Sequence, residues 1–327
     1  MKAAVYEKYG APELLRIEEV PAPAPGDSEV LVKVHAASVN AYDWHLIRAK
    51  PFFTRFQSGM FRPMNHIPGA DIAGVVEAAG KSVTQWKPGD RVYGCLESCG
   101  KGGLAAGGFA EYACAKESVL ASMPSNASFG EAAALPMAAV TALQGLRGSG
   151  QAIPGRKMLV NGASGGVGSY AVQLAKAFGA HTTAVCSAGA VDMVRSLGAD
   201  CVLDYTARGF HIDGAYDLIL DVAASLSVPA YRRALAPGGV CAVVGFSSIR
   251  QLLGIAFAGK RIQMVMADNT SQSDLADLNA LYEAGEIRSV IDSTYPLHEA
   301  AQAVRHVESG HPKGKVVIDL TRRIRYN

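Results

Sequence analysis

The chain has 327 residues, of which 49% are hydrophobic and 18% are charged, and its formal net charge is +2. This length exceeds what one hydrophobic core usually covers and predicts two domains, while the near-neutral charge argues against nucleic-acid and anionic-membrane partners. No stretch is apolar for the length of a membrane span and no secretory signal is recognisable, so we expect a cytoplasmic globular protein.

The first 120 residues have the pattern of β-strands. In the segment 30–35 valine occupies every second position, which is the period of a strand with two different faces. Turn signals recur at residues 25–27, 68–69 and 88–90, where proline is followed by glycine. This part of the chain is predicted to be a mostly antiparallel β barrel with little helix.

The pattern becomes helical after residue 122. Ser128 and Glu131 have the spacing of a capping box that opens an alanine-rich helix. Pro136 follows, and proline is favoured in the first turn of a helix. We therefore expect a second helix to begin at Pro136.

The run Asn161-Gly-Ala-Ser-Gly-Gly-Val-Gly168 lies between an apolar stretch and a segment with apolar residues at helical spacing. A strand, a glycine turn and a helix in this order direct unpaired backbone N–H groups at one place, which suits a pyrophosphate. Gly165 is expected to permit the tight turn, Gly166 to allow close approach of a ligand, and Gly168 to let the helix pack against the strand.

Beyond this turn, short apolar runs alternate with helical patterns, which indicates a parallel sheet covered by helices on both faces. The expected strands are residues 157–160, 181–186, 201–203, 217–220, 239–245 and 261–266. A last strand, residues 314–319, returns to the β pattern. We therefore expect an α/β fold in which a doubly wound sheet (124–286) is inserted into a barrel domain (1–123 and 287–327). A cleft between two such domains is a usual place for a small-molecule site.

Several short motifs occur together along the chain. They are Ala37-Ser-Val-Asn40 with Asp43, Pro68–Gly74, Lys87–Val92, Gly108–Tyr112, Ala132–Pro136, Thr141-Ala-Leu, the glycine run, Leu197–Asp200 and Gly314–Val317. The ensemble resembles the medium-chain dehydrogenase/reductase superfamily, specifically its zinc-independent quinone-oxidoreductase-like branch. The resemblance covers essentially the whole chain and implies a Rossmann domain inserted into a GroES-like catalytic domain.

Zinc enzymes of that superfamily need an early cysteine and a Gly-His-Glu motif as metal ligands. Here Gly69 is followed by Ala70 and Asp71, and no cysteine lies around Asn40, so no metal is expected. Without a metal to stabilise an alkoxide, the easier reaction is hydride transfer to quinones or α,β-unsaturated carbonyl compounds. Two alternatives stay open: a specialised enoyl or 2-alkenal reductase, and a non-catalytic NADPH-binding protein with a regulatory or structural role.

The second strand of the sheet bears on the choice of cofactor. NAD sites carry an acidic residue about twenty residues beyond the glycine turn, but residues 186–189 are Cys-Ser-Ala-Gly. A 2′-phosphate is tolerated there, so NADPH is expected, with NADH as the alternative because the basic residue that relatives carry after this serine is absent. The predicted cofactor contacts, several of them implied by the resemblance, are Asn40, Thr141, Ser164, Gly165, Gly166, Val167, Ser187, Tyr205, Val222, Gly245, Phe246 and Ser247.

By the same resemblance, Asn40, Tyr42 and His45 face the nicotinamide and are the catalytic candidates. His45 or Tyr42 would donate to a developing enolate oxygen, and the alternative for His45 is a surface or structural role. Asp43 is expected to anchor the backbone rather than transfer a proton. The apolar residues between 52 and 64 form either a lid over a hydrophobic acceptor pocket or a helix packed on the barrel.

The remaining expectations concern assembly and cysteines. The strand 261–266 is expected at the edge of the sheet, where the resemblance suggests pairing in a homodimer. Cys186, Cys201 and Cys241 fall in apolar strands and are interpreted as small buried hydrophobic residues in a reducing compartment.

Overall fold

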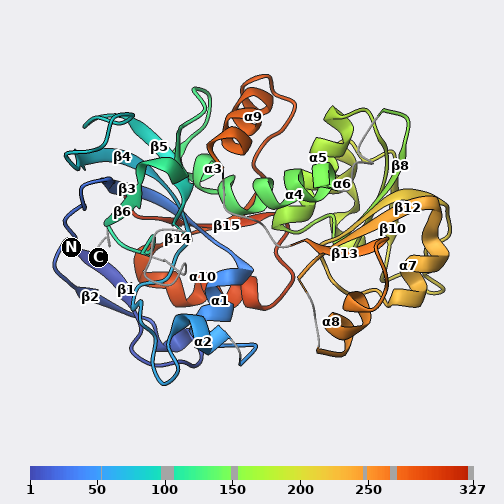
Figure 1. Cartoon of the computed structure of the whole chain (residues 1–327), viewed down its shortest axis with the longest axis horizontal. Coiled ribbons are helices and arrows are strands. Elements are labelled where there is room, and N and C mark those ends of the chain that lie inside the picture. Colours follow the sequence, from blue (N-terminus) through green and yellow to red (C-terminus); the bar gives the residue numbers. More distant parts are fainter. Residues whose placement is uncertain (53, 97–106, 149–153, 246–248, 266–270, 323–327) are drawn as a thin grey trace. The chain divides into compact units, whose positions relative to one another are not determined.

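The computed structural model describes residues 1–52, 54–96, 107–148, 154–245, 249–265 and 271–322 (Figure 1). The chain divides into two compact units. Unit 1 comprises Met1–Met137, Asn269–Glu283 and Ser289–Asn327, and unit 2 comprises Ala138–Asp268 and Ala284–Arg288. Most of unit 2 is therefore a segment inserted within the sequence of unit 1.

Unit 1 is built on a seven-stranded sheet with β3 (Glu29–Val39) at its centre. The strand order is β14 (Ile291–Pro296), β15 (Lys315–Asp319), β3, β4 (Asp71–Ala79), β5 (Arg91–Cys95) and β7 (Leu120–Ser122), and β6 (Tyr112–Lys116) also pairs with β3. All these pairings are antiparallel except that of β14 with β15. A separate antiparallel pair joins β1 (Lys2–Val5) to β2 (Arg16–Glu19).

The sheet of unit 1 matches the predicted barrel only loosely. The alternation in β3 is confirmed, because Val30, Val32 and Val34 are all buried. Within the described residues, however, the sheet keeps two ends, β14 and β7, with no pairing that joins them. The register of β3 against β4 shifts twice, and such irregularities bend a sheet.

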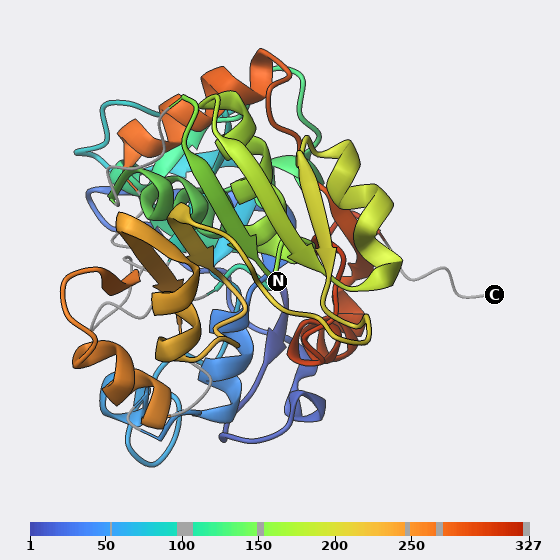
Figure 2. The ribbon, with the colours of Figure 1, turned by 90° about the vertical axis from the view of Figure 1, so that its right-hand side faces the viewer.

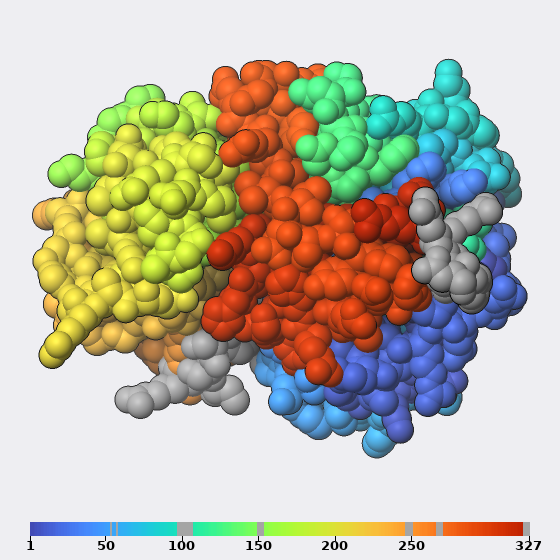
Figure 3. Space-filling view, turned by 180° about the vertical axis from the view of Figure 1, so that it is seen from behind, coloured from blue at the N-terminus to red at the C-terminus, as the bar shows by residue number. Residues whose placement is uncertain are grey.

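Five helices belong to unit 1 within its described residues. They are α1 (Ala41–Arg48), α2 (Thr54–Ser58), α3 (Phe129–Ala133), α9 (Gln272–Glu283) and α10 (Ala300–Glu308). Ile47 of α1, Ala303 of α10 and Val316 of β15 share one core cluster. Segments from both ends of the chain are thus packed together, and Figure 3 shows the region of α10 next to the N-terminal residues.

The two predicted helix starts are confirmed. The Ser128 hydroxyl accepts from the Glu131 N–H at 3.3 Å, while Glu131 Oε2 accepts from the Ser128 N–H at 2.9 Å. This capping box opens α3, and α4 (Pro136–Gly148) begins at Pro136.

Unit 2 contains the predicted doubly wound sheet (Figure 2). Its strand order is β10 (Cys201–Asp204), β9 (His181–Cys186), β8 (Lys157–Asn161), β11 (Tyr216–Asp221), β12 (Leu235–Val244) and β13 (Ile262–Val265). Every pairing is parallel. Its helices within the described residues are most of α4, together with α5 (Gly166–Ala177), α6 (Val191–Ser196), α7 (Val228–Ala234) and α8 (Ile249–Ala256). As predicted, β13 lies at one edge of the sheet.

One expectation about the cysteines is wrong. Cys186 and Cys241 are buried as predicted, but Cys201 is exposed. It is the first residue of β10, which lies at the edge of the sheet and pairs with β9 on one side. Within the part of the chain that the structure describes, no helix is long and apolar enough to cross a membrane.

Candidate functional site

The glycine turn joins β8 to α5, as predicted, but the glycine that makes the tight turn is not the one that was expected. Gly162 has φ +85°, the left-handed conformation that glycine favours, so it makes the tight turn. Gly165 has φ −78° and ψ −179°, extended backbone that any residue adopts, and it is the N-cap of α5. The expectation that Gly165 permits the turn is therefore wrong, because the reversal occurs three residues earlier.

Gly168 allows close packing, as predicted. A Cβ at this position would overlap the carbonyl oxygen of Gly162 and lie 2.8 Å from the Ala163 Cα. The first turn of α5 therefore rests directly on the backbone that follows β8. Only a residue without a side chain permits this contact.

The first turn of α5 offers free backbone donors. The N–H groups of Gly166, Val167 and Gly168 have no acceptor among the described residues, whereas the Ser169 N–H bonds to the Gly165 carbonyl at 2.9 Å. Residues 164–167 are partly exposed, so solvent or a ligand reaches them. Free N–H groups at the positive end of a helix dipole suit a diphosphate.

The other predicted cofactor residues of unit 2 follow the carboxyl ends of its strands. Ser187 follows β9, Tyr205 follows β10, Val222 follows β11 and Gly245 follows β12. Ligands of doubly wound sheets bind at this edge. Thr141 is buried in α4, and Phe246 and Ser247 lie outside the described residues.

An acid that sequence reasoning missed lies beside the end of β9. Asp204 ends β10, and its carboxylate accepts from the Thr206 N–H at 2.8 Å and the Thr206 hydroxyl at 2.6 Å. These hydrogen bonds lower the pKa of Asp204, and the backbone of Ala188 adds to the effect. The spacing from the glycine turn does not reveal this acid, because Asp204 comes from the third strand rather than the second.

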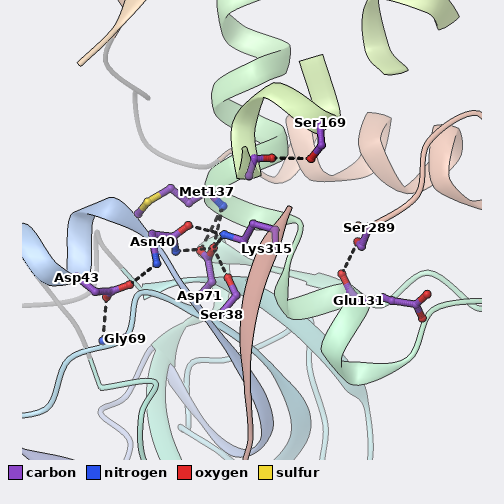
Figure 4. A network of polar contacts seen from close by, with 11 residues as sticks. Ser38, Asn40, Asp43, Gly69, Asp71, Glu131, Met137, Ser169, Ser289 and Lys315 are labelled. Atoms are coloured by element: carbon purple, nitrogen blue, oxygen red, sulfur yellow. Dashed lines mark hydrogen bonds and ion pairs between the residues drawn. The ribbon is translucent and has the colours of Figure 1, made fainter. Parts of the chain in front are cut away.

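Unit 1 contains a buried polar network centred on Asp71 (Figure 4). Asp71 Oδ2 accepts from the Ser38 hydroxyl at 3.1 Å and from Asn40 Nδ2 at 2.9 Å. Lys315 Nζ lies 3.7 Å from the same oxygen and donates to Asn40 Oδ1 at 2.5 Å. The Met137 N–H, in the first turn of α4, donates to Asp71 Oδ1 at 3.2 Å. Three distant segments are therefore joined through one carboxylate.

Asp43 anchors the backbone, as predicted. Its carboxylate accepts from the Asn40 N–H at 2.8 Å and from the Gly69 N–H at 3.1 Å. Burial raises the pKa of Asp43 to about 7, and the Asp71 charge adds to this rise. Burial likewise raises the pKa of Asp71 and lowers that of Lys315, although each attracts the charged form of the other.

The three catalytic candidates occupy the beginning of α1. Asn40 is its N-cap, and both ends of its amide are engaged by Asp71 and Lys315. Tyr42 is partly buried in the first turn. His45 stacks on Trp44 with ring centroids 3.6 Å apart, and its Nδ1 lies 2.6 Å from the Lys50 carbonyl oxygen.

This contact assigns the tautomer of His45. A carbonyl oxygen can only accept, so Nδ1 carries the hydrogen and the neutral ring has an unprotonated Nε2. Burial lowers the pKa of His45, which favours this neutral form. The ring is therefore poorly suited to donate a proton from Nε2.

Sequence reasoning did not identify Lys315 as a site residue, although it lies in one of the family motifs. The sequence feature that could have revealed Lys315 is its position in front of Val-Val-Ile, an apolar run that is buried in β15. A charged residue at the start of a buried strand requires a partner. Here that partner is Asp71.

Comparison with known proteins gives the family. The model of the alcohol dehydrogenase GroES-like domain matches residues 26–125, and that of a zinc-binding dehydrogenase matches residues 197–318. A chloroplastic quinone-oxidoreductase of Triphysaria versicolor is 35% identical over 98% of this chain and 98% of its own. The chain belongs to the medium-chain dehydrogenase/reductase superfamily.

Two further comparisons agree with this membership of the superfamily and with its quinone-oxidoreductase-like branch. A chloroplastic NADPH-dependent alkenal/one oxidoreductase of Arabidopsis thaliana is 34% identical over 97% of this chain and 79% of its own. The solved structure of the quinone oxidoreductase from Coxiella burnetii has a TM-score of 0.88 and 27% identity, covering 98% of this chain and 99% of that one. The predicted resemblance is confirmed.

One of the matching models is named for zinc, but the residues of this chain do not fit a catalytic zinc. Ala70 carries no donor atom, and the amide of Asn40 is held by Asp71 and Lys315. The Lys315 ammonium already supplies a positive charge beside the Asp71 carboxylate. Among the described residues, no group of three His, Cys, Asp or Glu side chains is placed to hold a metal ion.

Proposed function

We propose that this protein is a zinc-independent, NADPH-dependent oxidoreductase that transfers hydride to quinones or α,β-unsaturated carbonyl compounds. The observation that carries the proposal is the open glycine turn at the start of α5, with free N–H groups at Gly166, Val167 and Gly168. The acceptor classes are those in the names of its relatives, a quinone oxidoreductase and an alkenal/one oxidoreductase.

When bound, NADPH supplies the hydride, and the chain must hold and orient it. The first turn of α5 would hold the diphosphate, and the residues after the other strands would hold the rest of the dinucleotide. For these contacts we retain Asn40 and Thr141 together with Ser164, Gly165, Gly166, Val167, Ser187, Tyr205, Val222, Gly245, Phe246 and Ser247. The ionised Asp204 beside the end of β9 keeps NADH as the alternative, since a carboxylate repels a 2′-phosphate.

The chain must also stabilise the negative oxygen of the reduced acceptor. Of the candidates at the start of α1, we assign this role to Tyr42, whose hydroxyl can donate a hydrogen bond. His45 carries its hydrogen on Nδ1 and directs it to Lys50. Water would supply the proton that the reduced acceptor takes up.

The apolar segment after α1 favours a bulky acceptor. Phe52, Phe56 and Phe61 are 61%, 69% and 92% exposed, so the alternative that they form a helix packed on the sheet does not describe them. Arg55 stacks on Phe52 and on Tyr9, which holds the segment in place from one side. We propose that these phenylalanines contact an apolar acceptor.

Assembly and compartment are part of the proposal. The edge strand β13 leaves backbone groups on one side, and pairing of two copies along it would cover them. The buried Cys186 and Cys241 suit a reducing compartment, for which we propose the cytoplasm. Both relatives named above are chloroplastic, so imaging of the tagged full-length chain decides the compartment.

The proposal is tested with purified, metal-free protein, NADPH or NADH, and either a quinone or a 2-alkenal. Oxidation of NADPH by one of these acceptors, with NADH slower, supports it. A preference for the 2-alkenal favours the specialised alkenal reductase, which the Arabidopsis relative supports. Tight NADPH binding without turnover on any electrophile favours the non-catalytic protein.

A further inference from the structure

Asp221 occupies a special position in the sheet of unit 2. It is the last residue of β11, and its register partner is Asn161, the last residue of β8. From β8 the chain adds β9 and β10 on one side, and then β11, β12 and β13 on the other. The carboxyl ends of β8 and β11 therefore flank the point where the strand order reverses, which is where doubly wound sheets bind their ligands.

The Asp221 carboxylate is buried and accepts hydrogen bonds from the end of β8, from the loop after β11 and from α7. Oδ1 accepts from Asn161 Nδ2 at 2.8 Å and from the N–H groups of Ala223 and Ala224 at 3.0 and 2.8 Å. Oδ2 accepts from the Tyr231 hydroxyl at 2.7 Å. Burial raises the pKa of Asp221, and these donors oppose the rise by favouring the ionised form. A neutral or truncated side chain could not satisfy so many donors.

The loop after β11 is held in a strained conformation. Ala224 has φ +48°, which an alanine rarely adopts. Its N–H bonds to Asp221, and its carbonyl oxygen accepts from Gln251 Nε2 at 2.8 Å. Such strain costs about 1–3 kcal/mol and persists only where neighbouring groups enforce it.

The same loop is tied to the glycine turn. The Val222 N–H donates to the Asn161 carbonyl oxygen at 3.0 Å. At Gly162, an added Cβ would lie 3.0 Å from Val222 Cγ2 and 3.1 Å from the Ala223 nitrogen. The turn and the loop are therefore in close contact, and a shift of one displaces the other.

We propose that Asp221 is a positioning residue of the dinucleotide site, which sets the loop of Val222 against the glycine turn without touching the cofactor itself. The inference rests on the proposed function, because it requires that a dinucleotide binds at this edge of the sheet. It assigns a binding role to a buried carboxylate at the end of a strand. None of the residues predicted to touch the cofactor is altered in its test.

The test compares Asp221→Asn with the wild-type protein. The amide places an N–H where a carboxylate oxygen now accepts, so the loop of residues 222–226 is released. We expect the Kd for NADPH, measured by fluorescence titration, to rise about tenfold or more, as the loss of one charge-assisted hydrogen bond predicts. The KM for NADPH should rise likewise, while the KM for the acceptor stays unchanged.

Asp217→Asn is the matched control. Asp217 lies near the other end of β11 and accepts from Arg156 and from the Lys157 N–H, both at 2.9 Å. This variant should lose stability and keep the wild-type Kd for NADPH. An equal rise in Kd in both variants would reduce Asp221 to a structural residue and overturn the proposal.

If Asp221→Asn does not fold, Tyr231→Phe tests the positioning role of Asp221 instead. It removes one donor to Asp221 and leaves the carboxylate in place, so a rise in Kd of about threefold is expected. Wild-type affinity in the folded variants overturns this inference and leaves the proposed function standing. Failure of the wild-type protein to bind either NADPH or NADH overturns both.

Discussion

Lys315 Nζ lies 3.7 Å from Asp71 Oδ2, and both side chains are almost completely buried. The two residues come from β15 and β4, which are separated by β3 in the sheet. Asn40 links them, because its amide donates to the acid and accepts from the lysine. A buried charge network thus joins two strands that are not neighbours in the sheet.

Removing one member of this pair should be more harmful than removing both. Lys315→Met leaves the Asp71 carboxylate buried without its cation, and we expect the free energy of unfolding to fall by about 3 kcal/mol. The double variant Lys315→Met with Asp71→Asn should regain part of this loss. Denaturant unfolding of the four proteins in the cycle measures the coupling, and additive losses would show that the pair does not interact.

The pKa of Asp43 predicts a pH dependence of stability. Burial raises it from 3.8 to about 7, so the folded chain binds this proton more tightly than the unfolded chain. The resulting stabilisation is complete below about pH 4 and is lost as the pH rises through 7. Asp43→Asn lacks this titration, so the wild-type protein should exceed the variant in stability by more at pH 5 than at pH 7. If the difference in stability between the two proteins is the same at pH 5 and pH 7, the pKa of Asp43 in the folded chain lies outside this range and the prediction is wrong.

The glycine turn yields a paired prediction. Gly168→Ala forces a Cβ onto the backbone of Gly162 and Ala163 and should lower the free energy of unfolding by about 2 kcal/mol. Gly165→Ala meets only the Gly162 carbonyl oxygen at 3.6 Å, so its stability should change by less than about 1 kcal/mol. Its NADPH affinity should nevertheless fall, because the side chain would occupy the predicted cofactor contact. Unchanged affinity in Gly165→Ala would place the dinucleotide elsewhere.

Substitution of Tyr42 and His45 distinguishes the two candidate donors to the acceptor oxygen. Tyr42→Phe should lower kcat by about 100-fold with little change in the KM for the acceptor. His45→Asn keeps a donor near the Lys50 carbonyl and should retain kcat within about twofold. The opposite order of effects in steady-state kinetics would return the donor role to His45.

How much the sequence predicts depends on whether a pattern is local. The glycine turn, the capping box of Ser128 and Glu131, and the alternation of strands with helices are set by neighbouring residues, and all three are confirmed. The sheet of unit 1 matches the predicted barrel only loosely, because alternation shows that a strand has two faces but not how the sheet curves.

The charged partners were harder to predict than the elements that carry them. Lys315 is 244 positions from Asp71, and Asp221 is 60 positions from Asn161. Only the sheet topology brings the members of each pair together. The assignment of the turn to Gly165 failed for a related reason, since a run of several glycines does not reveal which one has positive φ.

The most direct test of the account follows the hydride itself. NADPH that carries deuterium at both C4 positions is incubated with the protein and a 2-alkenal, and the product is analysed by mass spectrometry and NMR. The account predicts a saturated product with one deuterium on the former β carbon. Reduction without transfer of deuterium, or no oxidation of NADPH with either the 2-alkenal or a quinone, would contradict it.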